Sequence, residues 1–179
     1  MLNMFYAGCF KKLQTNSSAS FQSRLPSAII TLMSLSHFRY LVKKSPTPLL
    51  ETALLLSKNI AYPSLEIAVW INEINQLSDE AAASIPQKAS EKEKIELLVG
   101  WLFSPEANGP QFSGNRKLYG DPRNSYLNEV IERKLGIPIT LSVVCIEVAA
   151  RIGLQFKGIG LPGHFVLGGY VSNEHLPIL

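Results

Sequence analysis

The sequence predicts an α+β fold, with N-terminal helices followed by one helix packed on a short antiparallel sheet. Apolar residues recur at helical spacing through most of residues 49–152, which is typical of helices that bury one face. Residues 155–159 and 164–170 instead favour strands, joined by a Gly-Leu-Pro-Gly turn. With 179 residues, the chain is long enough for one domain with a buried core.

Three helices are expected before residue 104, each with an apolar face. They span residues 49–60, 64–77 and 91–103. Ser90 and Glu93 form the Ser-x-x-Glu pattern of a capping box, which indicates that the third helix begins directly after Ser90. Residues 78–90, which include a proline, are expected to form a linker. Residues 104–120, rich in Gly and Pro, are expected to form a long loop.

Two further helices lead into the predicted sheet. The first is expected over residues 125–135, because a capping residue precedes it and Gly136 can end it. Pro138 then favours the start of a second helix over residues 140–152, and Gly153 closes that helix.

Residues 1–48 differ in composition from the rest of the chain. The first 50 residues contain six Lys or Arg, no Asp or Glu, and many Ser. Such a segment is typical of an organelle transit peptide; a disordered basic tail is the alternative. The remainder has 11 basic and 14 acidic residues, and this balance does not favour nucleic-acid binding. No membrane span is expected either, because no apolar run reaches ~20 residues.

The two cysteines, Cys9 and Cys145, do not indicate a disulfide framework. Cys145 falls on the apolar stripe of the predicted 140–152 helix, more than one turn from its start. At that depth the N-terminal amides do little to lower a thiol pKa. We therefore expect Cys145 to be a buried packing residue, and a catalytic nucleophile is the alternative.

His164 is the strongest candidate for a catalytic side chain. It opens a predicted strand, where thiol hydrolases hold the general base that faces a nucleophile on a helix. A structural histidine is the alternative. Thr140 lies at the start of the predicted 140–152 helix, where its hydroxyl would be a nucleophile only beside a base. Capping of that helix explains Thr140 more simply.

Other polar residues suggest a binding cluster and an ion pair. Asp121, Arg123 and Asn124 gather between the long loop and the helix that follows it. Helix capping accounts for most of this cluster. Arg123, however, has no acidic residue at a helical spacing with which to pair, so we expect it to be able to bind a carboxylate of a ligand. Glu147 and Arg151 are spaced i, i+4 in the favourable order and predict a solvated pair.

The sequence predicts neither a cofactor nor a metal site. Residues 158–163 match Gly-x-Gly-x-x-Gly. However, no helix is expected after the third glycine, and the chain has no room for the acid that a dinucleotide site needs about twenty residues further on. The three histidines come without Cys-x-x-Cys or His-Glu-x-x-His spacing.

Part of the chain resembles the SirB-type transglutaminase-like core family. The resemblance is carried by DPRNSYLNEVIERKLGIPITLSVV over residues 121–144 and by GLPGHFVL over residues 160–167. Members occur in bacteria, cyanobacteria and plant plastids, and one F-box protein contains a similar domain. The resemblance implies a partial papain-like, transglutaminase-like core over residues 121–179, preceded by a helical region over residues 49–103.

The resemblance also bears on catalysis. The wider superfamily uses a Cys–His–Asp triad, and the resemblance assigns its histidine to His164. The cysteine position falls near Ile139 and Thr140, so it is not a cysteine here, as is usual for the family. The triad aspartate would follow on a next strand that the chain, ending at Leu179, is not expected to reach, and the tetratricopeptide-type helices of other members are also missing. The resemblance thus implies a truncated product.

These observations favour a non-catalytic interaction or regulatory module with an unidentified protein partner in the chloroplast. Mitochondrion and cytoplasm are the alternative locations. The alternative function is a hydrolase or acyltransferase with Thr140 or Cys145 as nucleophile and His164 as general base. A third hypothesis is that the chain does not fold stably alone, because a two-stranded sheet leaves an edge uncovered.

Overall fold

The computed structural model describes residues 35–162, 164–171 and 174–178; for His164 and residues 174–178 the description covers the backbone. The chain divides into two compact units, residues 1–37 and 38–179, and the second contains every helix and strand from Leu49 onward. Most of the predicted leader, residues 1–48, lies outside the described residues. Its last part, from Phe38, belongs to the second unit.

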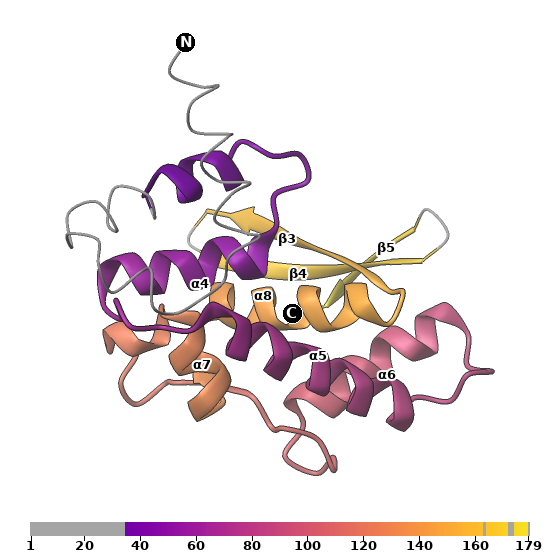
Figure 1. Cartoon of the computed structure of the whole chain (residues 1–179). Coiled ribbons are helices and arrows are strands. Elements are labelled where there is room, and N and C mark those ends of the chain that lie inside the picture. The colour runs from indigo at the N-terminus through magenta and orange to yellow at the C-terminus, as the bar shows by residue number, and fades with distance from the viewer. Residues whose placement is uncertain (1–34, 163, 172–173, 179) are drawn as a thin grey trace. The chain divides into compact units, whose positions relative to one another are not determined.

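Five α-helices run from Leu49 to Arg151 in the described part of the second unit (Figure 1). They are α4 (Leu49–Ile60), α5 (Ile67–Ser84), α6 (Glu91–Phe103), α7 (Leu127–Arg133) and α8 (Pro138–Arg151). Helices α4 and α6 have the predicted bounds. The capping box of α6 is confirmed, because Ser90 N–H donates to Glu93 Oε2 at 2.8 Å and Glu93 N–H donates to Ser90 Oγ at 3.3 Å.

Helix α5 corrects the predicted linker over residues 78–90. It continues to Ser84 because its buried stripe extends past Leu77 to Ala81, which is 0% exposed. Ser78 is compatible with this burial, since its hydroxyl donates to the Ile74 carbonyl oxygen at 2.6 Å. The spacing of the apolar residues along this stripe was the helical signal in the sequence. Because α5 ends at Ser84 and α6 begins at Glu91, only residues 85–90 connect them.

The end of α7 also differs from the prediction. Lys134, with φ of 58°, takes the left-handed conformation that ends the helix, so Gly136 is not its stop signal. Gly136 instead lies in β2 (Leu135–Gly136), which pairs in parallel with β1 (Ser113–Gly114) inside the predicted loop. A Cβ at Gly136 would lie 2.8 Å from Thr140 Oγ1, so this position requires glycine for close packing.

The sheet has one more strand than predicted. β3 (Gln155–Leu161), β4 (His164–Val171) and β5 (Glu174–Ile178) form an antiparallel sheet in the order β3-β4-β5. The expected two-stranded sheet is therefore wrong. β5 gave no clear strand signal because it is short and contains Pro177, a residue that sheets tolerate on edge strands. Leu167 pairs with Ile178 and Val171 with Glu174.

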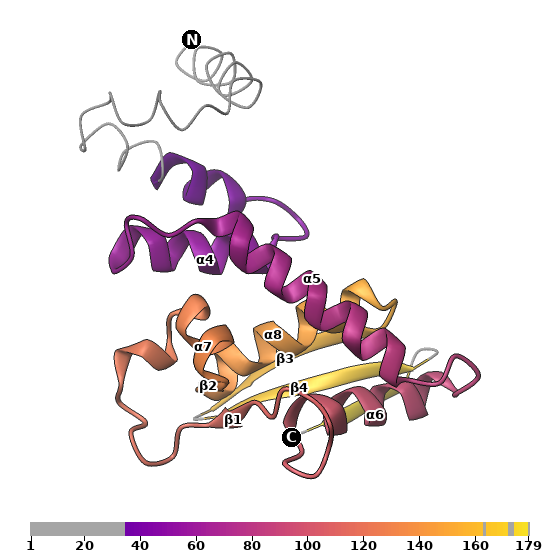
Figure 2. The same cartoon turned by 60° about the horizontal axis from the view of Figure 1, so that its bottom comes forward.

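Helix α8 is the centre of the core and confirms the α+β architecture. Val144, Cys145, Val148 and Ala149 are at most 1% exposed, and α8 contacts the other four helices as well as β3 and β4. Figure 2 shows that α8 lies along the sheet and that α5 crosses α8.

The strand that follows α8 runs back along it. Fourteen helical residues span about 21 Å and seven strand residues about 23 Å, so the end of β3 reaches the N-terminal end of α8. Both views place the start of β4 at that same end (Figures 1 and 2). The topology therefore brings the His164 backbone and the first turn of α8 to one end of the domain.

Glu147 and Arg151 form the predicted ion pair, with Nη1 and Oε2 2.7 Å apart. The pair does more than face solvent. Glu147 Oε1 accepts a hydrogen bond from the Leu50 N–H at the start of α4 (3.1 Å), and Arg151 Nε donates to Asn75 Oδ1 of α5 (2.8 Å). These two side chains of α8 therefore tie three helices together.

Candidate functional site

Thr140 caps the first turn of α8. Its Oγ1 donates to the Asn124 carbonyl oxygen at 2.8 Å and lies 3.1 Å from the Ile137 carbonyl oxygen, and it accepts from the Ile137 N–H at 3.2 Å. The residue is 9% exposed. The expected capping role is confirmed. Because the hydroxyl hydrogen is directed to a main-chain carbonyl, no general base among the described side chains activates it.

Cys145 is the buried packing residue that the sequence predicted. It is 0% exposed, and burial raises the pKa of its thiol to about 12. A nucleophilic cysteine requires a thiolate near neutral pH, usually favoured by a neighbouring cation or a helix N-terminus. The surroundings of Cys145 supply neither effect, so they do not support a nucleophile at this position.

Asn124 is the polar centre of the region before α8. It is completely buried and lies in the 3-10 turn η1 (Pro122–Asn124). Its Nδ2 donates to the carbonyl oxygens of Leu118 (2.8 Å) and Tyr119 (3.2 Å). Its Oδ1 accepts from Asn115 Nδ2 (3.1 Å) and Arg133 Nη2 (3.3 Å). Together with its bond from Thr140, Asn124 connects the long loop, α7 and α8.

Arg123 has an acidic partner, which corrects the prediction that it lacks one. Its Nε lies 3.1 Å from both carboxylate oxygens of Asp121, and its Nη2 lies 2.8 Å from Oδ2. The arginine holds the pKa of the Asp121 carboxyl below its ordinary value. Helical spacing did not predict this pair because η1 turns the chain within two residues. The carboxylate-binding role of Arg123 thus stays a prediction, and such a ligand would compete with Asp121.

A second part of this network was not predicted. Tyr62 donates its hydroxyl hydrogen to Glu129 Oε1 at 2.9 Å, and burial, reinforced by this carboxylate, raises the Tyr62 pKa. Arg133 forms ion pairs with two carboxylates. Its Nε lies 3.2 Å from Glu129 Oε2, although the geometry is not that of a hydrogen bond, and its Nη1 lies 3.8 Å from Asp121 Oδ2. The i, i+4 spacing of Glu129 and Arg133 was the available sequence signal.

His164 is placed by its backbone. It opens β4 and pairs with Leu161 at the end of the hairpin, at the end of the domain where α8 begins. Its side chain lies outside the described residues. The assignment of His164 as a general base that faces Thr140 or Cys145 remains a prediction.

The glycine-rich segment does not lead into a helix. Gly158 and Gly160 lie in β3, and β4 is the next element. Within residues 35–162, 164–171 and 174–178, no three His, Cys, Asp or Glu side chains are grouped as metal ligands.

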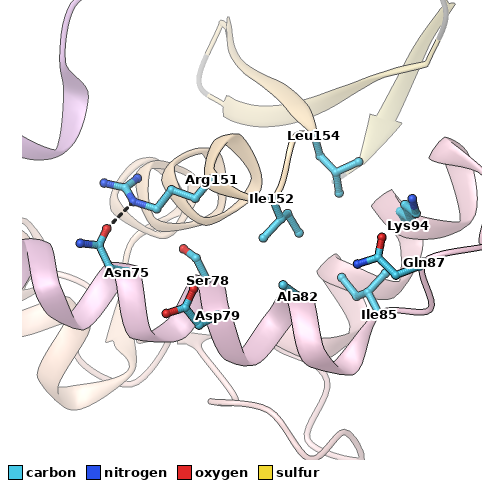
Figure 3. Close-up of a pocket in the computed structure, with 10 residues that line it drawn as sticks. All are labelled: Asn75, Ser78, Asp79, Ala82, Ile85, Gln87, Lys94, Arg151, Ile152 and Leu154. Carbon is cyan, nitrogen blue, oxygen red and sulfur yellow. Dashed lines mark hydrogen bonds between the residues drawn. The ribbon is translucent and has the colours of Figure 1, made fainter.

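A cavity of about 400 Å³ lies at the other end of α8 (Figure 3). It is lined by Arg151 and Ile152 at the C-terminal end of α8, and by residues such as Asp79 of α5 and Lys94 of α6. Since α8 is about 21 Å long, this cavity does not belong to the network around Asn124 and Thr140.

Comparison with known proteins identifies the family. A family model described as the transglutaminase-like superfamily matches residues 68–177, more than half of the chain. The chain belongs to the transglutaminase-like superfamily. The match covers α8, β3, β4, most of β5 and the side chains that bind Asn124, so this part of the site lies within the transglutaminase-like domain.

Several relatives of the transglutaminase-like domain are similar to this chain. It is 37% identical over 120 residues to a UPF0162 protein of Xylella fastidiosa, covering 67% of this chain and 41% of that protein. It is 32% identical over 126 residues to a UPF0162 protein of Vibrio cholerae, covering 70% and 45%. F-box only protein 21 of Mus musculus is 37% identical over 57 residues, 32% of this chain and 9% of that protein.

The transglutaminase-like chain spans less than half the length of the UPF0162 relatives that it matches. No solved structure matched it. None of its described helices combines the length and apolarity needed to cross a membrane.

Proposed function

We propose that this chain is a SirB-type, non-catalytic transglutaminase-like domain that acts as an interaction or regulatory module. One observation carries the proposal: the first turn of α8, where the resemblance puts the cysteine position near Ile139 and Thr140, presents a hydroxyl that caps the helix. Loss of the nucleophile from a triad can cost several orders of magnitude in rate.

The remaining thiol of the domain supports the same proposal. Cys145 is inside the core with a raised pKa, so it would have to leave the hydrophobic core to attack a substrate. The similar stretch in F-box only protein 21 is in accord with a domain that serves within proteins of different architecture.

Reactivity of purified protein tests the proposal. In a Cys9→Ser background, the native chain is expected to resist an iodoacetamide-type probe at neutral pH and a hydroxyl-directed acylating probe, and to react at Cys145 only after unfolding. Fast labelling of Cys145 or Thr140 in the native state that His164→Ala abolishes would show a working nucleophile and base, and would overturn the non-catalytic assignment.

The proposed location is the chloroplast, and its support is the basic, acid-free and Ser-rich composition of the first 50 residues. Residues 1–48 fused to a fluorescent protein are expected to direct it into plastids of plant cells. The matched control replaces the basic residues of this segment by Gln and should leave the fusion in the cytoplasm. Delivery to mitochondria, or no delivery by either fusion, would contradict the proposed location.

A further inference from the structure

Apolar and basic side chains are exposed together between β1 and η1. Leu118 and Tyr119 are 62% and 66% exposed, and Arg116 and Lys117 directly before them are exposed as well. Neither cation has an ion-pair partner among the described residues. In Figure 2 the segment between β1 and α7 projects from the body of the domain. Grouped large apolar side chains on a surface often mark a place where another molecule binds.

The backbone of this segment is fixed, although its side chains are exposed. The Leu118 N–H donates to Asn115 Oδ1 at 3.1 Å, and the Leu118 carbonyl oxygen accepts from Asn124 Nδ2 at 2.8 Å and from the Asp121 N–H at 3.1 Å. The Tyr119 carbonyl oxygen accepts from the same Asn124 amide. Since the backbone of this loop is already held, its ordering adds little to the entropic cost of binding, and the ordering of the side chains is the main cost that remains.

A third large apolar side chain, Ile139, is exposed at the start of α8. It is 47% exposed, and its neighbour Thr140 is hydrogen-bonded to Asn124, the residue that also holds Leu118 and Tyr119. One buried asparagine thus connects both parts. The Arg116–Tyr119 surface is defined here as Arg116, Lys117, Leu118, Tyr119 and Ile139.

The charge of this surface is opposite to that of the domain. Residues 51–179 have 11 basic and 14 acidic residues, whereas residues 115–120 have two basic residues and no acid. Arg123 adds no net charge nearby because Asp121 neutralises it. A partner with acidic groups around apolar side chains is complementary to this arrangement. Single-stranded nucleic acid fits less well, since Leu118 and Ile139 offer no aromatic face for stacking bases.

We propose that the Arg116–Tyr119 surface binds a protein segment in which acidic residues flank large apolar side chains. The inference rests on the proposed function, because it names the surface through which a non-catalytic module would act. Arg116 and Lys117 would attract the acidic flanks, and Leu118, Tyr119 and Ile139 would bury the apolar side chains.

Selection from a random peptide display library on the full chain tests the partner chemistry. The wild type is expected to enrich peptides with Asp or Glu around Leu, Phe or Trp. The charge-reversed variant R116E/K117E is expected to enrich Lys- or Arg-containing peptides instead. The control K88E/K92E makes the same charge change at exposed positions and should enrich the same peptides as the wild type. Matching urea midpoints would show that the variants fold.

Binding constants complete the test. A fluorescein-labelled acidic peptide from the selection is expected to bind R116E/K117E and L118S/Y119S at least ~10-fold more weakly than wild type by anisotropy, and more weakly as salt rises. Failure to enrich acidic peptides, equal affinity of R116E/K117E and wild type, or tighter binding of a single-stranded oligonucleotide would overturn this inference. None of these results depends on the probe reactivity that tests the non-catalytic assignment.

Discussion

Thr140 donates its hydroxyl hydrogen to the main-chain carbonyl oxygen of Asn124 over 2.8 Å, and both residues are buried. The bond joins α8 to the turn η1 at the position where the resemblance expects the catalytic cysteine of the superfamily. The hydroxyl therefore serves the fold, and its removal should change stability.

Replacement of Thr140 by Val keeps the branched shape and removes the hydroxyl. The Asn124 carbonyl oxygen then loses a donor, and the free energy of unfolding should fall by about 1–2 kcal/mol. Thr140→Ser retains the hydroxyl and should lose less. Urea unfolding measures both, and a larger loss for Ser than for Val would show that the methyl group, not the hydrogen bond, dominates.

Asn124→Ala should be among the most damaging polar substitutions in the domain. It removes two donated and two accepted hydrogen bonds at a completely buried position, and should lower the free energy of unfolding by about 2–4 kcal/mol. The matched control is Asn72→Ala at an exposed position of α5. This substitution is expected to change the free energy of unfolding by at most ~0.5 kcal/mol. Equal effects would contradict the role of Asn124.

Cys145 predicts a loss of stability at alkaline pH. Burial raises its pKa from 9.0 to about 12, so above pH 9 the unfolded chain loses a proton that the folded chain keeps. The free energy of unfolding must then fall as the pH rises toward 12, by up to about 1.4 kcal/mol per pH unit. In a Cys9→Ser background, Cys145→Ala removes this contribution, so its stability relative to the parent should improve above pH 9 and stay constant below it.

Glu147 should matter more than an ordinary surface carboxylate. Glu147→Ala removes both the acceptor for the Leu50 N–H and the Arg151 ion pair, and should lower the free energy of unfolding by about 1–3 kcal/mol. Glu147→Gln keeps an acceptor and should lose less. Glu132→Ala, at an exposed position of α7, is the control with an expected change of at most ~0.5 kcal/mol.

Gly158 and Gly160 form a matched pair on β3. A Cβ at Gly158 would collide with the ring of Phe165, whereas a Cβ at Gly160 has no heavy atom within 4 Å. Gly158→Ala should therefore lower the free energy of unfolding by about 1–3 kcal/mol, and Gly160→Ala should be close to neutral. Phe165→Ala should reduce the penalty of Gly158→Ala in a double-mutant cycle; additive effects would exclude the collision as its cause.

Local signals in the sequence were sufficient for most helices. The apolar stripe and the Ser90–Glu93 capping box predicted α6, and the apolar spacing along α8 correctly predicted that Cys145 is buried. These features depend on residues within one or two turns, which is why a linear pattern can specify them. One glycine signal was misleading, since Gly136 is required by packing against Thr140 and does not end α7.

Only the tertiary structure decided the long-range relationships. Strand β5 exists because β4 offers it an edge, and Glu147 meets the Leu50 N–H from 97 residues away. The same holds for Asn124, which joins the long loop, α7 and α8. The sequence by itself determined most of the helices and the β3–β4 hairpin, together with the burial of residues such as Cys145. Which polar groups meet depends on how those elements pack, because a hydrogen bond forms only when packing brings donor and acceptor within about 3 Å.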